Sequence, residues 1–230
     1  MEPDGAIVIL LAAGSGRRLG TAEPKALLPI GGRPMLAVAA ATAVASPSVS
    51  GLVVTFPAGW EGRARACVED LGVAAWFVEG GDSRQASVRA ALGEVPEHVD
   101  AVAVHDAARP FASPELFTRV IRAVTDGADG AVPVLAVTDT VLRVRGELVE
   151  GTEAREELAL GQTPQAFRVS VLREAHAKAD VAGASFTDDA SMLRWAGFDV
   201  RAIPGDPANV KITTLADLAQ ADRRMGGRDG

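Results

Sequence analysis

The chain has 230 residues, of which 48% are hydrophobic, and this suits one α/β domain with a full core. A formal net charge of −7 with acidic residues spread along the chain disfavours nucleic acid as a partner, and the single Cys67 excludes a disulfide framework and a cysteine zinc site. The N-terminus lacks a basic segment and its apolar run is too short to span a membrane, so we expect a cytoplasmic protein without membrane association.

The first predicted strand, Ala6–Leu11, leads directly into a loop of small residues. Gly14 and Gly16 let backbone N–H groups approach an anion, because no Cβ stands in the way. Three cations follow that could meet the charge of a polyphosphate: Arg17, Arg18 and Lys25. The segment predicts a nucleoside triphosphate site; the alternative is an ordinary strand-to-helix turn with surface arginines.

Two common phosphate-binding loops do not match this segment. The dinucleotide fingerprint G-x-G-x-x-G would need its third glycine one position before Gly20, and the run Leu52–Phe56 ends in Pro57 rather than in an acid for the ribose. A Walker A loop needs Gly-Lys-Ser/Thr, which the sequence does not contain here. The remaining pattern, A-A-G-x-G-x-R-x-x-x-x-x-P-K, resembles that of nucleotidyltransferases that join a nucleotide to a phosphorylated sugar or polyol.

Apolar runs and helix-like stretches alternate along the next hundred residues. Strands are expected at Leu52–Phe56, Val73–Val78, Ala101–Val104 and Ala131–Val134, and helices at Pro34–Val44, Trp60–Leu71, Ser83–Leu92 and Pro114–Val124. This alternation predicts an α/β fold with a mostly parallel, Rossmann-like sheet and helices on both faces. Ligands of such sheets bind at the carboxyl ends of strands, so the loops after Leu11, Val78 and Val104 are the candidate site.

Polar segments follow two of these strands. Gly80-Gly81-Asp82-Ser83 offers close backbone approach and short polar groups for a base and ribose, although a plain helix cap explains it equally well. Asp106 stands at a strand end, where a carboxylate is placed to bind Mg²⁺, and Arg109 could hold a second phosphate. We expect the neighbouring His105 to be structural.

The alternation breaks at Thr138–Thr152. Val141–Val144 and Glu147–Glu150 flank Arg145-Gly146, which predicts a β-hairpin that is too polar to be core. The hairpin is either an arm that pairs with a second subunit or a solvated surface feature. Helices at Val169–Ala179 and Asp188–Trp195 and a strand at Asp199–Ile203 complete a single domain, residues 1–230, with the inserted arm at about 138–155.

Eight motifs occur in one order along the chain, and H-D-A-A-R-P is the most specific of them. They are A-A-G-S-G-R-R-L, P-K, G-G-D-S-R-x-x-S-V, H-D-A-A-R-P, D-T, T-P-Q-A-F, T-D-D-A-S and N-V-K-I-T. From Ile7 to about Leu218 this series closely resembles the 2-C-methyl-D-erythritol 4-phosphate cytidylyltransferase family. The resemblance implies a nucleotidyltransferase fold and transfer of CMP from CTP to methylerythritol phosphate, with release of pyrophosphate, in non-mevalonate isoprenoid biosynthesis. It also implies Mg²⁺ dependence and a homodimer whose subunits exchange the β-arm.

The resemblance further assigns roles to residues. Cytidine would contact Ala12, Ala13, Gly14, Gly81, Asp82 and Ser87. The catalytic residues would be Arg18 and Lys25 on the triphosphate, with Arg155 and Lys211 positioning the polyol phosphate. The polyol phosphate would also lie near Asp106, Arg109, Thr140, Thr163 and Thr187, and Mg²⁺ would be held by Asp106 or mainly by the triphosphate.

The sequence departs from the family pattern at two places. Leu11 stands where a proline often precedes Ala-Ala-Gly, and Lys25 is followed by Ala-Leu-Leu rather than by a Gln-Phe/Tyr-Leu type of run.

Two alternatives also stay open: a cytidylyltransferase for ribitol 5-phosphate, and a non-catalytic regulator that binds a nucleotide. A phosphate monoester is largely ionised near pH 7, so the expected reaction requires no general base.

Overall fold

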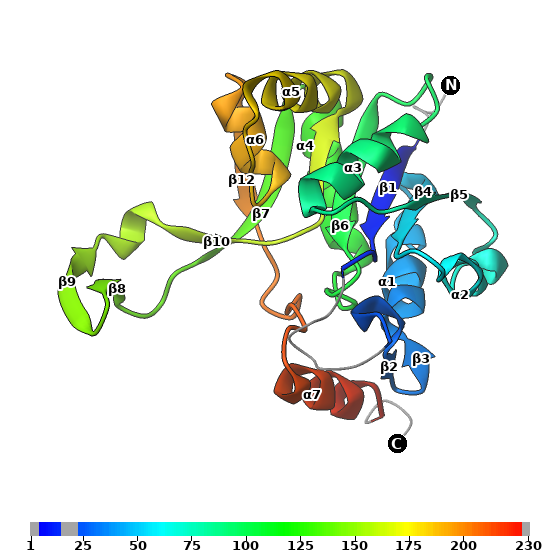
Figure 1. Ribbon diagram of the computed structural model, residues 1–230, viewed down its shortest axis with the longest axis horizontal. Helices are drawn as coiled ribbons and strands as arrows, with labels where there is room; N and C mark the ends of the chain where they lie inside the picture. The colour runs from blue at the N-terminus through cyan, green and yellow to red at the C-terminus, as the bar shows by residue number, and fades with distance from the viewer. Residues whose placement is uncertain (1–4, 15–22, 227–230) are drawn as a thin grey trace.

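A central sheet of eight strands organises the computed structural model, which describes residues 5–14 and 23–226. Hydrogen-bonded strands follow one another in the order β10-β7-β11-β6-β1-β4-β5, and β12 pairs with β7 on the edge opposite β11 (Figure 1). The strands are β1 (Ala6–Leu11), β4 (Val49–Phe56), β5 (Ala74–Glu79), β6 (Ala101–Asp106), β7 (Gly130–Ala136), β10 (Ala159–Gly161), β11 (Gln165–Arg168) and β12 (Val200–Pro204). The strand pairs are parallel except where β10 and β11 take part.

Helices cover both faces of this sheet. The helices are α1 (Met35–Val44), α2 (Glu61–Ala66), α3 (Arg84–Gly93), α4 (Pro114–Thr125), α5 (Val169–Ala182), α6 (Asp189–Trp195) and α7 (Leu215–Gly226). Alternate residues of β1 face opposite layers: Val8 and Leu10 pack in the cluster with α1, α2 and α4, and Ile7 and Ile9 in the cluster with α3, α5 and α6. The continuous apolar run of β1 is thus explained by burial on both faces, as predicted for a parallel strand.

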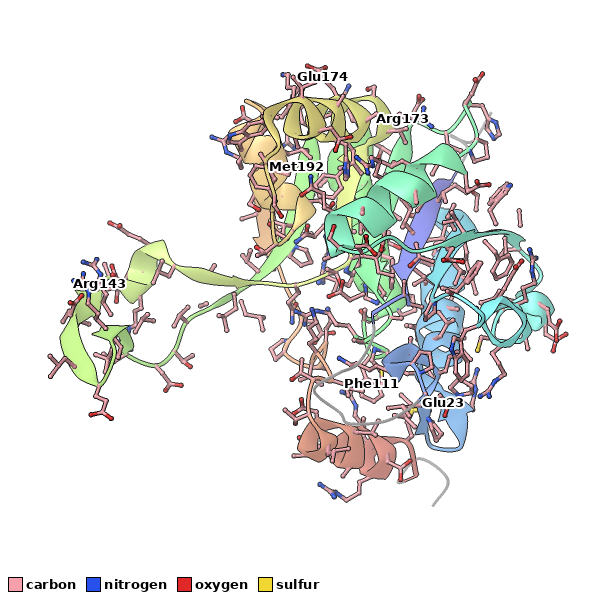
Figure 2. All side chains as sticks on the ribbon, viewed as in Figure 1. Glu23, Phe111, Arg143, Arg173, Glu174 and Met192 are labelled. Carbon is pink, nitrogen blue, oxygen red and sulfur yellow. The ribbon has the colours of Figure 1, made fainter. Side chains whose placement is uncertain are left out.

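The helix predicted at Trp60–Leu71 is divided in two. α2 ends at Ala66 and a separate 3-10 turn covers Glu69–Leu71. Val68 lies at the break and is 3% exposed in the core, so the interruption lets this side chain reach the sheet. Figure 2 shows the sticks of all described side chains on the ribbon, with Met192 of the buried α6 face labelled.

Several elements lie outside the sequence prediction. The short antiparallel β11 fills the space between β6 and β7, and β2 (Pro29–Ile30) and β3 (Arg33–Pro34) form a small hairpin before α1. α7 packs near β2, where its Asp222 accepts a hydrogen bond from the Gly31 N–H at 2.8 Å.

The predicted hairpin is present as β8 (Val141–Arg145) and β9 (Leu148–Glu153), which pair only with each other. Gly146 begins the turn with φ of 60°, a conformation that favours glycine. The hairpin projects away from the rest of the domain (Figure 1), and its strands expose four apolar side chains, Leu142, Val144, Leu148 and Val149. Among the described helices, none combines the length and apolar character needed to cross a membrane.

Candidate active site

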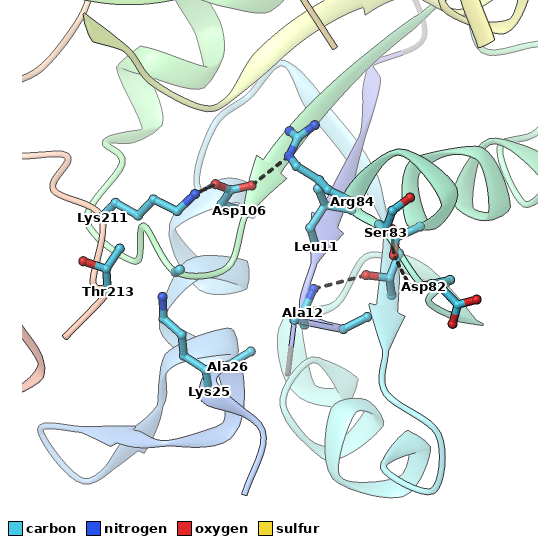
Figure 3. A pocket seen from close by; sticks show the side chains of 16 residues that line it. Leu11, Ala12, Lys25, Ala26, Asp82, Ser83, Arg84, Asp106, Lys211 and Thr213 are labelled. Atoms are coloured by element: carbon cyan, nitrogen blue, oxygen red, sulfur yellow. Dashed lines mark hydrogen bonds and ion pairs between the residues drawn. The ribbon is translucent and has the colours of Figure 1, made fainter. Parts of the chain in front are cut away.

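A cleft of about 660 Å³ opens at the carboxyl ends of β1, β5 and β6, where the sequence placed the site (Figure 3). It brings together nine of the residues that were expected to bind nucleotide or substrate: Ala12, Ala13, Gly14, Lys25, Gly81, Asp82, Ser87, Asp106 and Lys211. Thr55, Ser83, Arg84 and Thr213 line the same cleft and were not among the expected residues. Arg84 stands within the G-G-D-S-R motif, so the sequence held a signal for it.

Backbone atoms form one wall of the cleft. The Ala12 N–H donates to Thr55 Oγ1 at 3.1 Å, which fixes the chain as it leaves β1. A Cβ at Gly80 would lie 2.2 Å from the Cβ of Ala13, so the loops after β1 and β5 approach as closely as they do because residue 80 is a glycine. This wall presents short groups and main chain to a ligand, which suits recognition of a base and ribose.

The start of α3 completes this wall. The Ser83 hydroxyl accepts a hydrogen bond from the Ala86 N–H at 3.0 Å and caps the helix. One turn later the Ser87 hydroxyl donates to the Ser83 carbonyl at 2.9 Å. The helix-cap interpretation of this segment is therefore correct, and the capped segment also lines the cleft through Gly81, Asp82 and Ser87.

Charged side chains gather around Asp106, where Arg84 arrives from the start of α3 and Lys211 from the other side of the carboxylate. The Lys211 ammonium lies 2.7 Å from Asp106 Oδ2, and Arg84 Nε lies 3.4 Å from Asp106 Oδ1. Burial raises the pKa of Asp106, but the positive charges of Arg84 and Lys211 outweigh it and hold this pKa at about 2. Asp106 is therefore an anion at neutral pH.

Lys25 enters the cleft from the segment before α1. It begins a 3-10 turn, Lys25–Leu27, whose next two residues, Ala26 and Leu27, are buried. Figure 3 shows the Lys25 side chain extending toward the same space as Lys211. The run Ala-Leu-Leu after the lysine thus anchors the turn despite its difference from the family pattern.

His105 is buried beneath Asp106 and has a structural role, as expected. The Asp106 N–H donates to Thr163 Oγ1 at 3.0 Å, and Thr163 Oγ1 lies 3.1 Å from His105 Nδ1. Because the Arg109 carbonyl can only accept, Nε2 carries the hydrogen of the neutral ring and donates to that carbonyl at 3.1 Å, so Nδ1 accepts from the Thr163 hydroxyl. Burial lowers the pKa of His105 to about 4, so the ring is neutral near pH 7.

A network of hydrogen bonds holds the segment 206–213, which carries Lys211. Asn209 is fully buried, and its Nδ2 donates to the Thr163 carbonyl at 2.8 Å. The Asn209 carbonyl accepts from Arg109 Nη1 at 2.9 Å and from Gln162 Nε2 at 3.2 Å. The T-P-Q and N-V-K motifs therefore meet in space, and Arg109 and Thr163 support Lys211 indirectly, by holding the neighbouring Asn209.

Three expected residues lie away from these contacts in the single chain. Thr140 and Arg155 are exposed at the base of the arm, where Arg155 Nη1 donates to the Thr138 carbonyl at 2.7 Å. Thr187 is exposed, directly before the Asp188 cap of α6. Arg18 falls outside the described residues, and its expected role stays a prediction.

The donor groups in the cleft decide how it could hold a metal ion. Within residues 5–14 and 23–226, no group of three or more His, Cys, Asp or Glu side chains could hold a metal ion. Asp82 and Asp106 are the carboxylates among the cleft-lining residues, and each Asp106 oxygen already faces a cation. This donor set fits an ion that is coordinated jointly by a carboxylate of the cleft and by the oxygens of a bound polyphosphate, rather than one held by protein alone.

Comparison with known proteins gives a consistent result. The sequence model of the family described as "IspD: 2-C-methyl-D-erythritol 4-phosphate cytidylyltransferase" matches residues 6–226. A relative named "Bifunctional enzyme IspD/IspF", from Nitratidesulfovibrio vulgaris, is 44% identical over 224 residues, covering 94% of this chain and 57% of the relative. A protein of the same name from Rhodopseudomonas palustris is 43% identical, over 94% of this chain and 55% of its own length. The chain thus spans a little over half the length of these relatives.

Two solved structures resemble the fold over nearly its whole length. The 2-C-methyl-D-erythritol 4-phosphate cytidylyltransferase of Thermus thermophilus is 36% identical, with a TM-score of 0.80 over 96% of this chain and 99% of its own. The 4-diphosphocytidyl-2C-methyl-D-erythritol synthase of Anaerococcus prevotii is 25% identical, with a TM-score of 0.86 over 98% of this chain and 100% of its own.

Proposed function

Because the chain belongs to the 2-C-methyl-D-erythritol 4-phosphate cytidylyltransferase family, we propose that it transfers CMP from CTP to 2-C-methyl-D-erythritol 4-phosphate. The products are 4-diphosphocytidyl-2-C-methyl-D-erythritol, an intermediate of isoprenoid biosynthesis, and pyrophosphate. One observation carries this proposal: a single cleft joins a wall of glycine loops and main chain to a charged wall with Lys25, Lys211 and Asp106.

In this reaction a phosphate oxygen of the polyol attacks the α-phosphorus of CTP. The new P–O bond forms as the bond from the α-phosphorus to the bridging oxygen of the β-phosphate breaks, and that electron pair leaves with pyrophosphate. Two anions must meet for this to happen, so catalysis consists of positioning and of stabilising negative charge. Lys25 and Lys211 extend into the space where the two phosphates would meet, and Arg18 is expected to join them.

The described residues that line the cleft include no histidine, and the chemistry does not need a general base. The second pKa of a phosphate monoester is about 6, so its oxygen is already deprotonated near pH 7. His105, the histidine beside the cleft, has a hydrogen-bond partner at each ring nitrogen. Asp106 would instead orient the Lys211 ammonium, which lies 2.7 Å from its Oδ2, and would accept hydrogen bonds from polyol hydroxyl groups.

Mg²⁺ is proposed to enter with the nucleotide. The triphosphate oxygens would be its main ligands, and Asp106 or Asp82 would complete its coordination from the cleft wall. When bound, the ion neutralises charge on the triphosphate and on the leaving pyrophosphate.

The arm is proposed to build a homodimer. Four apolar side chains on its strands are exposed in the single chain, at 47% for Leu142, 57% for Val144, 74% for Leu148 and 61% for Val149. Burying them against a second subunit would remove this apolar surface from water. In a two-fold dimer the arm of each subunit would bring Thr140 and Arg155 to the active site of its neighbour.

The assay that tests the function is pyrophosphate release from CTP with two polyol phosphates compared. We expect release with methylerythritol phosphate and much slower release with ribitol 5-phosphate. A preference for ribitol 5-phosphate would contradict the proposed substrate. Binding of CTP without turnover on either compound would instead identify a nucleotide-binding regulator.

A further inference from the structure

Arg84 lines the cleft but has no part in the reaction as proposed above. It is the first residue of α3, and its side chain is 24% exposed. Nη1 donates to Asp189 Oδ2 at 2.6 Å, and Nε donates to Asp106 Oδ1 at 3.4 Å. Figure 3 shows Arg84 and Lys211 on opposite sides of the Asp106 carboxylate. Each oxygen of Asp106 is thus held by a different cation.

Asp189 anchors Arg84 from the buried side. It is the first residue of α6, and only 1% of its surface is exposed. His176 of α5 also lies near it, with Nε2 3.9 Å from Asp189 Oδ1. Burial lowers the pKa of His176, so its ring is neutral near pH 7. Arg84 is therefore the cation that balances the buried Asp189.

The two cations on Asp106 differ in how firmly they are held. Lys211 has a flexible stem and a side chain that is 41% exposed, and in the proposed reaction its ammonium must also meet phosphate oxygens. The Arg84 guanidinium is planar and donates in two directions at once, so its bond to Asp189 fixes the direction of its bond to Asp106. The Asp106 N–H is fixed independently by Thr163.

From this geometry we infer that Arg84, held by Asp189, is a positioning residue: it fixes the Asp106 carboxylate, which in turn places the Lys211 ammonium. The inference rests on the proposed function, because it assigns a task within that reaction. It predicts that Arg84 affects the rate of CMP transfer more than the binding of CTP, since Asp106 and Lys211 lie across the cleft from the glycine-rich wall.

Two variants test this role. Arg84→Lys keeps the positive charge, but one ammonium is too compact to hold both carboxylates in the observed directions. The double variant Arg84→Gln/Asp189→Asn removes both charges together, so that no buried charge is left unpaired. Arg89→Lys is the matched control, because Arg89 lies on the same helix and pairs with Asp180 at the surface.

Thermal unfolding, kcat, KM for CTP and a crystal structure are measured for each variant beside the unmodified enzyme. Both Arg84 variants are expected to fold, to keep KM for CTP within about threefold and to lose roughly tenfold or more in kcat, with the Lys211 ammonium displaced from Asp106. The control is expected to match the unmodified enzyme.

A kcat within about twofold of the unmodified enzyme in either folded variant would overturn the positioning role. Loss of folding in both variants would also overturn it, because the pair would then be structural. If the unmodified enzyme forms no product, the proposed function fails. The crystal structures then decide the positioning role, which is overturned if Lys211 keeps its place beside Asp106.

Discussion

Replacing Thr163 by valine separates support of the site from contact with substrate. The resemblance to the family assigns Thr163 to the polyol phosphate, whereas in the structure its hydroxyl accepts from the Asp106 N–H and donates to His105 Nδ1. Thr163 is 5% exposed, so valine would leave both of these partners buried and without a hydrogen bond. Each orphaned group costs about 1–3 kcal/mol, so the two together predict a loss of roughly 2–6 kcal/mol in the free energy of unfolding.

The assay compares Thr163→Val with Thr163→Ser. Serine keeps the hydroxyl and removes one buried methyl group, at a cost of about 1 kcal/mol. For a chain of this size each kcal/mol lowers the unfolding midpoint by about 2–4 °C, so valine should lower it by roughly 4–24 °C and serine by a few degrees. A valine variant with an unchanged midpoint and a raised KM for methylerythritol phosphate would refute this reasoning and make the hydroxyl a substrate ligand.

Three further predictions follow from the cleft, its buried histidine and the arm. Lys25→Ala should lower kcat by ~10²-fold or more in a folded protein, and Arg18→Ala should act similarly, with Arg17→Ala as the milder control; near-normal turnover without Lys25 would remove its role. Unfolded histidine takes up a proton near pH 6.5 while folded His105 does so near pH 4, so its contribution to stability should be full above the first pH and lost as pH falls through the second. Urea unfolding at several pH values checks this, and stability that rises on acidification over that range would contradict it. Mixing inactive Lys25→Ala with inactive Arg155→Ala should restore roughly a quarter of normal activity, because half the dimers are mixed and each has one intact site; no recovery in proven mixed dimers would place Arg155 in its own chain's site.

The sheet was readable from the sequence because its strands are buried on both faces. Runs such as Ala6–Leu11 are apolar at every position, and helix-like stretches separate them. β11 could not be predicted, because its four residues hold one large apolar side chain, Phe167. It is a strand because it forms hydrogen bonds with both β6 and β7. The break after α2 was missed for a similar reason, because burial of Val68 overrides local helical pattern.

Part of the candidate site could likewise be predicted from the sequence, and part could not. Its cleft-lining residues from strand ends and glycine loops follow from local sequence, because a parallel sheet gathers the carboxyl ends of its strands at one edge. The hydrogen bond from Arg109 to Asn209 beneath Lys211 and the contact of Arg84 with Asp189 join segments about a hundred residues apart, and no local pattern reports such pairings. In the proposed dimer Thr140 and Arg155 would act at the site of a second subunit, and neither the sequence nor the single chain places them there.

The most direct test of the central claim follows oxygen through the reaction. Methylerythritol phosphate labelled with ¹⁸O in its non-bridging phosphate oxygens is incubated with CTP and the enzyme, and both products are examined by mass spectrometry. Attack by the polyol phosphate on the α-phosphorus of CTP predicts that all of the label is retained in 4-diphosphocytidyl-2-C-methyl-D-erythritol and that pyrophosphate carries none. Label in pyrophosphate, or CTP consumed without a labelled cytidine product, would contradict the account.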